Sequence, residues 1–141
     1  MSLLALAAFA AAAAAAPIHS VDIDHRGTTY QVDYRASVTT KARTIGMAVS
    51  SRPSTQRCVM TATVSVERVI ADGDHELRAR VPGEKTFTQN LPGDCRGRDG
   101  QLAALVEDKA PAIGAHLAEA AAGDRHHALA AIEAAHHLAA N

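Results

Sequence analysis

The chain has 141 residues, of which 48% are hydrophobic and 3% aromatic, and its 14 basic and 15 acidic side chains almost cancel. This length and composition are typical of one globular domain and exclude a disordered or fibrous protein. The near-zero net charge gives no broad electrostatic attraction to nucleic acid or to an anionic membrane, and few aromatic rings are present to stack on bases, so nucleic acid is not an expected partner.

The N-terminal stretch MSLLALAAFAAAAAAA is uncharged and dominated by leucine and alanine, and Pro17 ends it. A transmembrane helix needs about 20 apolar residues, so this stretch is short for a membrane span. It is typical of a secretory signal, because small residues offer A-x-A cleavage sites between about Ala13 and Ala16. We expect residues 1–16 to be a signal peptide, with an uncleaved anchor as the alternative. Residues 17–141 would then form a single periplasmic or secreted domain with no membrane span after cleavage.

Cys58 and Cys95 are the only cysteines. In an oxidising compartment an even count most simply gives a disulfide, and the spacing of the pair excludes a CxxC redox motif. Closing a loop of this size would stabilise the fold by roughly 4 kcal/mol. Free or metal-binding thiols are the alternative to this structural bond.

Alternating apolar and polar residues predict strands over most of the first hundred residues. Such alternation gives a strand one buried and one solvated face. It runs from Tyr30 to Val38 and from Cys58 to Val66, and more briefly over 45–49 and 77–81. Turn motifs separate these segments: HRGT at 25–28, DGD at 72–74 and VPGE at 81–84, where Pro and Gly suit a type II turn. Short turns imply antiparallel neighbours.

After DCRGRDG the apolar spacing becomes helical. Asp99 is expected to cap the first helix, and Pro111 to kink or break it. Gly123 followed by Asp124 reads as a stop and a new cap, with a second helix from about Arg125. One apolar stripe is expected to face the core: Leu102, Leu105, Val106, Ala110, Ile113 and Leu117.

Together these patterns predict an α+β fold. We expect an antiparallel meander of four to six strands over about 19–91, with one or two C-terminal helices over about 100–139 packed on one face. One disulfide, between Cys58 and Cys95, would complete it.

Two pairs of histidines bracket the segment HHALAAIEAAHH at 126–137. On a helix Glu133 and His137 lie four residues apart and could share a divalent metal ion, with His126 as the nearest further ligand. His126 lies seven residues from Glu133, about 10 Å along the helix axis, and the spacing of the HExxH motif is absent. A complete site would need His116 or a second molecule, because zinc takes three or four protein ligands. The alternative is that these side chains are solvated or satisfied in the core.

The sequence contains none of the nucleophile-elbow, P-loop or dinucleotide-binding motifs. Pairs of acidic residues, such as Asp22 with Asp24 and Asp72 with Asp74, could serve as acid and base, but these positions fit a solvated strand face and a turn. No catalytic residue and no cofactor is therefore predicted.

Three segments, RPSTQRC at 52–58, TATVSVERVI at 61–70 and LPGDC at 91–95, resemble small exported proteins of Gram-negative bacteria that carry no assigned function. The resemblance covers approximately Tyr30 to Cys95. It implies export and pairing of the cysteines, and nothing about activity.

The leading hypothesis is thus a non-catalytic exported domain that binds another protein of the cell envelope. Its binding surface would be a sheet edge or the SSRPSTQR segment at 50–57, since loops on a rigid scaffold commonly carry binding. The alternative for this segment, which its position between two strands favours, is an ordinary connecting loop. The alternative hypothesis is a histidine-dependent binder of divalent metal ions.

Overall fold

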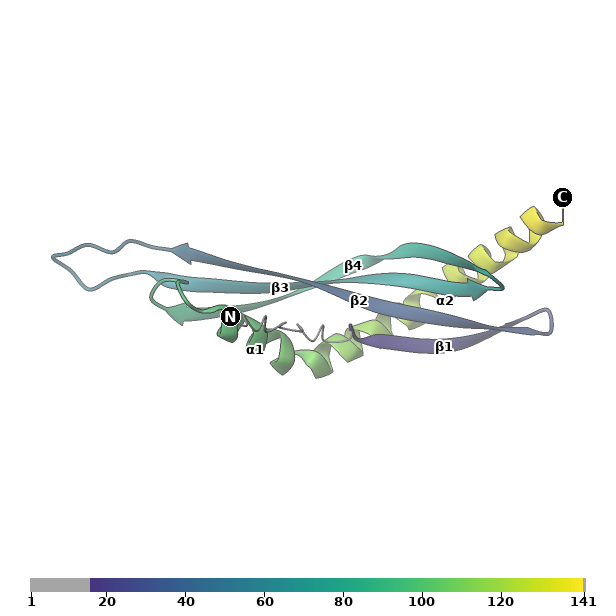
Figure 1. The fold of residues 1–141 in the computed structure, drawn as a ribbon, viewed down its shortest axis with the longest axis horizontal. Coiled ribbons are helices and arrows are strands. Elements are labelled where there is room, and N and C mark those ends of the chain that lie inside the picture. Colours follow the sequence, from purple (N-terminus) through teal and green to yellow (C-terminus); the bar gives the residue numbers. More distant parts are fainter. Residues whose placement is uncertain (1–15, 141) are drawn as a thin grey trace, which may run out of the picture.

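The computed structural model describes residues 16–140 (Figure 1). The predicted signal peptide therefore lies, except for its last residue, outside the described residues. Four antiparallel strands follow one another in space as in sequence: β1 (Ile18–His25), β2 (Thr28–Ile45), β3 (Arg57–Asp72) and β4 (His75–Pro92). Two helices, α1 (Asp99–Asp108) and α2 (Ala110–Ala139), complete the chain.

The two strong strand predictions are correct, and the strands are longer than predicted. The alternating apolar residues of β2 and β3 are buried against the helices, from Tyr30 to Ala36 and from Cys58 to Val66. The turns predicted at 25–28 and 72–74 are also correct, since they join β1 to β2 and β3 to β4.

The strand predicted over 45–49 is wrong beyond Ile45, where β2 ends. Gly46 adopts a positive φ of 88° and turns the chain out of the sheet. Met47 and Val49 consequently lie in the connection to β3 and are exposed, at 70% and 44% of their surfaces. We call residues 46–56 the tip loop.

The turn predicted at 81–84 is wrong, because β4 runs straight through this segment. Val66 pairs with Val81 and Val64 with Lys85, so Ser65 faces three residues of β4. Gly83 takes up the extra length with a φ of 99°. Pro82 is tolerated because β4 is an edge strand, where a missing N–H need not break the ladder. Proline and glycine here make a bulge.

The break predicted at Pro111 is correct: α1 ends at Asp108 and α2 begins at Ala110, with the proline in its first turn. The predicted cap is wrong, since Arg98 occupies the N-cap position and Asp99 is the first helical residue. Of the predicted stripe, Leu105, Ile113 and Leu117 are buried, Leu102 and Val106 are partly buried, and Ala110 is exposed at the start of α2.

The stop predicted at Gly123 and Asp124 is also wrong, because α2 continues to Ala139. Its buried residues recur every three or four positions and define a single face: Ile113, Leu117, Ala121, Asp124, Ala128 and Ile132. Asp124 belongs to this face, so its carboxylate is used in the core and not at a helix end.

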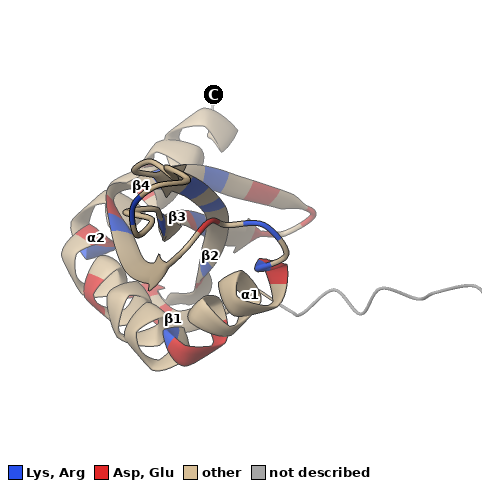
Figure 2. Cartoon of the chain, turned by 90° about the vertical axis from the view of Figure 1, so that its left-hand side faces the viewer, with Lys and Arg blue, Asp and Glu red and all other residues tan. Residues whose placement is uncertain are grey.

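The helices cover one face of the sheet, and α2 contacts all four strands as it crosses it. Figure 2, which views the molecule along its long axis from the tip-loop end, shows both helices on the same side of the curled sheet. A main core joins β1–β4 to α2, and a smaller cluster joins Cys58, Met60 and Ala62 to Leu105. The predicted α+β class, the antiparallel meander and the Cys58–Cys95 disulfide are confirmed. Within residues 16–140, neither helix is both long and apolar enough to cross a membrane.

Candidate functional site

The predicted metal ligands lie on the last turns of α2. Glu133 accepts a hydrogen bond from the guanidinium of Arg26, with 2.8 Å between Nη2 and Oε1, and so ties α2 to the β1–β2 turn. His126 is exposed, and its ring centroid lies 3.9 Å from that of His127. Across residues 16–140, no group of three or more His, Cys, Asp or Glu side chains is arranged to hold a metal ion. The site on Glu133, His137 and His126 stays a prediction.

His136, near the end of α2, contacts residues of β1 and β2 although it stays exposed. Its Nε2 lies 2.5 Å from the hydroxyl of Tyr30, and its ring lies 5.9 Å from that of His25. These contacts, with the Arg26–Glu133 ion pair, fasten the end of α2 to the β1–β2 turn. They account structurally for one of the four clustered histidines.

A polar network lies beneath the middle of α2. Asp124, only 5% exposed, accepts hydrogen bonds at Oδ2 from Arg68 (2.7 Å) and from the hydroxyl of Tyr34 (3.1 Å). Burial, together with the negative charge of Asp124, raises the pKa of Tyr34 to about 12. A buried charge needs an opposite charge and hydrogen bonds, and this network provides both. It pins α2 to β2 and β3.

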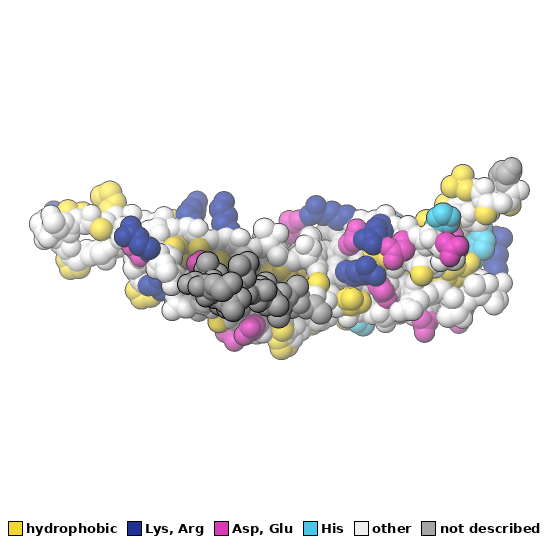
Figure 3. All heavy atoms as spheres, in the orientation of Figure 1, with side chains coloured by type: hydrophobic (Ala, Val, Ile, Leu, Met, Phe, Trp, Pro, Cys, Tyr) yellow, Lys and Arg dark blue, Asp and Glu magenta, His cyan; other side chains and the backbone are white. Residues whose placement is uncertain are grey.

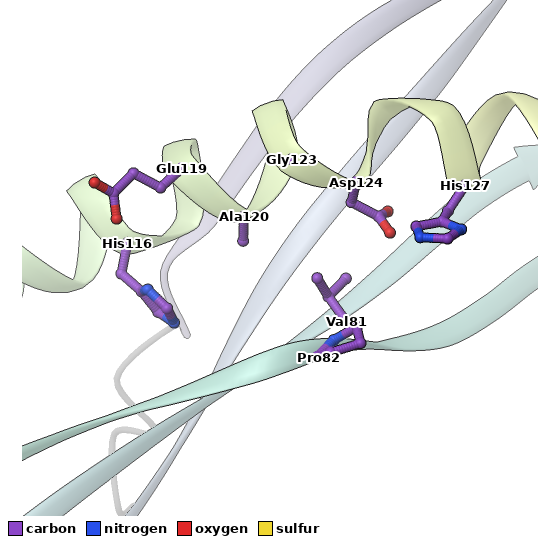
Figure 4. Close-up of a pocket in the computed structure, with 8 residues that line it drawn as sticks. All are labelled: Val81, Pro82, His116, Glu119, Ala120, Gly123, Asp124 and His127. Atoms are coloured by element: carbon purple, nitrogen blue, oxygen red, sulfur yellow. The ribbon is translucent and has the colours of Figure 1, made fainter.

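A groove of about 370 Å³ lies beside this network, between α2 and β4 (Figure 4). His116 and His127 face it, but they are eleven residues apart on one helix, which corresponds to about 16 Å along the axis. Two rings so far apart cannot act on the same bond. The groove is lined by Val81, Pro82, His116, Glu119, Ala120, Gly123, Asp124 and His127.

The tip loop has a defined conformation. The Thr55 amide donates to the Met47 carbonyl at 3.1 Å, and the Thr55 hydroxyl contacts both the amide and the carbonyl of Met47 at 3.2 Å. Arg52 adds a backbone hydrogen bond to Val49. Gly46 allows this closure, because a Cβ there would lie 2.4 Å from the Thr55 carbonyl oxygen. These hydrogen bonds close the loop and hold its backbone, and so its exposed side chains, in a defined arrangement.

The disulfide anchors the base of the tip loop. Cys58, the second residue of β3, is fully buried and bonded to Cys95, and Thr44 pairs with Cys58 across the sheet. The Cys95 amide donates to Thr44 Oγ1 at 3.0 Å, and the Gly93 amide donates to the Gln56 carbonyl at 2.9 Å. The end of the β2–β3 hairpin is thus tied to the segment that leads into α1.

Basic side chains gather along the same hairpin end. Residues 34–66 contain no Asp or Glu. We call residues 41–61 the arm. It carries four exposed basic side chains, none of which pairs with an acidic group among the described residues: Lys41, Arg43, Arg52 and Arg57. Figure 3 shows dark-blue and yellow side chains at this end, whereas acidic and histidine side chains are more frequent on the half with the C-terminus.

Comparisons with protein-family models, with curated proteins and with solved structures found no match to this chain. The resemblance to small exported bacterial proteins therefore stays a prediction.

The sequence patterns indicated one part of the arm as a candidate binding segment and did not indicate two others. The segment 50–57, interpreted either as a binding loop or as an ordinary connection, lies in the tip loop and at the first residue of β3. Met47 and Val49 were assigned to a strand face and so were missed. The acid-free stretch 34–66 was a readable signal that the near-zero net charge concealed.

Proposed function

We propose that this protein is a non-catalytic, exported interaction domain of the cell envelope, and that the arm is its binding surface. Export to the periplasm or the cell exterior accords with the disulfide, since such bonds persist in oxidising compartments. It also accords with the signal-like composition of residues 1–16.

The observation that carries this proposal is the tip loop. Exposed apolar side chains normally lie scattered on a protein surface, and a fixed loop that presents two of them needs an explanation. Met47 and Val49 project from a hydrogen-bonded frame that the disulfide anchors, among basic side chains without acidic partners. Such pre-organisation lowers the entropy cost of binding.

The groove beside α2 supports a binding function less well. Its one buried carboxylate, Asp124, is already engaged by Arg68 and Tyr34, and its two histidines are too far apart to act together. The arm instead presents exposed apolar side chains together with several basic side chains that have no acidic partner among the described residues.

Site-specific photocross-linking in the native host tests the proposal. A photoreactive phenylalanine analogue at position 49 should form adducts with an envelope component, because Val49 lies at the contact surface. The same analogue at position 74, in the exposed β3–β4 turn at the opposite end of the sheet (Figure 1), is the matched control. The absence of adducts at 49, or identical adducts at both positions, would contradict the proposal.

A further inference from the structure

The tip loop combines exposed large apolar side chains with a basic side chain that has no acidic partner among the described residues. Among the described residues only Ile18, Met47, Val49 and Leu138 are large hydrophobic side chains with high exposure, and two of these four lie in this loop. Arg52 lies in the same loop, and Arg57 begins the strand that follows it. Basic side chains beside exposed apolar ones match a partner surface that has an anionic outer layer and an apolar layer below it.

The small size of the tip loop favours a lipid bilayer over a protein as its partner. A stable protein interface buries about 800 Å² on each side and involves roughly 20–30 residues per partner. The large apolar side chains that the arm exposes, Met47 and Val49, both lie within residues 46–56, a segment far smaller than such a surface. A bilayer interface is less demanding, because a few buried apolar groups and a few cations near anionic headgroups add directly to the binding energy.

We therefore propose that the tip loop docks on an anionic lipid bilayer. This inference deepens the proposed function and rests on it: lipid would be the envelope component that the arm contacts. Met47 and Val49 enter the boundary between headgroups and acyl chains, while Arg52 and Arg57 contact the headgroups. The docking is peripheral, since the loop reaches only into the interface.

The distance of each basic residue from the tip loop predicts how much that residue contributes to membrane binding. Arg43 and Lys41 lie two and four residues before Ile45 on β2, which places them about 7 and 13 Å behind it at the rise of a strand. Electrostatic attraction decays over about 8 Å at physiological ionic strength. Arg52 and Arg57 should consequently contribute most to membrane binding, and Lys41 least.

Vesicle flotation with the purified protein tests the inference. We expect it to float with vesicles of phosphatidylglycerol and phosphatidylethanolamine, to stay behind with phosphatidylcholine vesicles, and to dissociate as salt increases. Arg52→Gln with Arg57→Gln should weaken partitioning about 25-fold, at about fivefold for each basic residue. Met47→Ser with Val49→Ser should weaken it about tenfold, because buried methyl and methylene groups are lost.

The matched control is Arg78→Gln with Arg80→Gln. This pair removes the same charge from β4, which is remote from the tip loop, and should change partitioning less than twofold. An equal loss in this control would show that general charge drives adsorption and would overturn the inference. Undiminished binding of the Met47 and Val49 variant would overturn it too.

Failure of the lipid inference can be distinguished from failure of the proposed function. Absence of flotation, together with cross-links from position 49 to a protein, would remove the lipid partner and leave the interaction domain standing. Circular dichroism and a non-reducing mass measurement should show that every variant keeps the fold and the disulfide, because the substituted side chains are exposed.

Discussion

Asp124 fits a helix cap by its sequence context, but in the structure it is a buried carboxylate in the middle of a helix. After a glycine, an aspartate is typical of a helix cap, because its side chain can accept hydrogen bonds from free backbone amides. Here the helix continues, and the carboxylate is held by Arg68 and Tyr34 instead. Those partners are 56 and 90 residues away in sequence, so no local pattern reveals them.

Removing the carboxylate of Asp124 should lower the free energy of unfolding substantially. Asp124→Ala leaves Arg68 buried with its charge uncompensated, and its Nε already has no hydrogen-bond partner among the described residues. We expect a loss of about 3–5 kcal/mol in the free energy of unfolding, measured by urea denaturation. Glu119→Ala, on the exposed side of the same helix, should change it by less than about 0.5 kcal/mol. Equal effects of the two substitutions would show that the network does not stabilise the fold.

Tyr34 should make the stability of the protein sensitive to alkaline pH. Its pKa is about 12 in the folded protein, against about 10 for an unperturbed tyrosine. Because the folded value is the higher one, the neutral phenol contributes stability that is complete below about pH 10 and is lost as pH rises toward 12. Urea denaturation at pH 9 and pH 11 should show a larger fall for the wild type than for Tyr34→Phe. Equal falls would contradict the role given to the buried phenol.

At the scale of the elements, the same residue types produced different structures in different places. Asp-Gly and Arg-Gly made the two hairpin turns that the sequence predicted, whereas Pro82 and Gly83 made a bulge within an edge strand. The local sequence at 81–84 fits both outcomes. Pairing of β4 with β3 on either side of Ser65 favours the bulge over the turn, and this pairing joins residues that are distant in the sequence.

Gly46 should be required for the shape of the tip loop. In Gly46→Ala the new Cβ would meet the Thr55 carbonyl oxygen at 2.4 Å, and the backbone would still need a positive φ. Gly73→Ala is the matched control, because Gly73 also has a positive φ but has open space around it. We expect Gly46→Ala to cost about 1–3 kcal/mol, and clearly more than the control, in urea denaturation.

Hydrogen exchange gives this comparison a local readout. The Thr55 amide, which donates to Met47, should lose protection in Gly46→Ala and keep it in Gly73→Ala. Unchanged protection of Thr55 in both variants would show that the loop does not depend on the glycine.

For the whole molecule, the fold was more predictable than the candidate site. Alternation in β2 and β3, two cysteines and a helical C-terminus were enough for the α+β class, because each of these signals is local or follows from composition. The arm depends instead on which side chains stay uncovered when distant segments pack. Met47 and Val49 fit a strand face by pattern, and only the turn at Gly46 exposes them.

The distribution of charge also becomes clear only for the whole molecule. A net charge of −1 indicates no preference for an anionic surface, yet the structure places the acid-free stretch 34–66 along one end of the molecule. An average over the chain cannot show this segregation, because it also counts the acidic residues outside the stretch, one of which, Asp94, precedes the cysteine that is bonded to the arm. A positional count would have predicted it from the sequence.

Export is the claim on which both proposals rest, and mass spectrometry of the protein recovered from its native host tests it most directly. The expected species begins at or near Pro17 and, without reduction, yields one peptide pair that joins Cys58 to Cys95. A chain that retains its first sixteen residues, with both thiols free to react with an alkylating agent, would contradict the account.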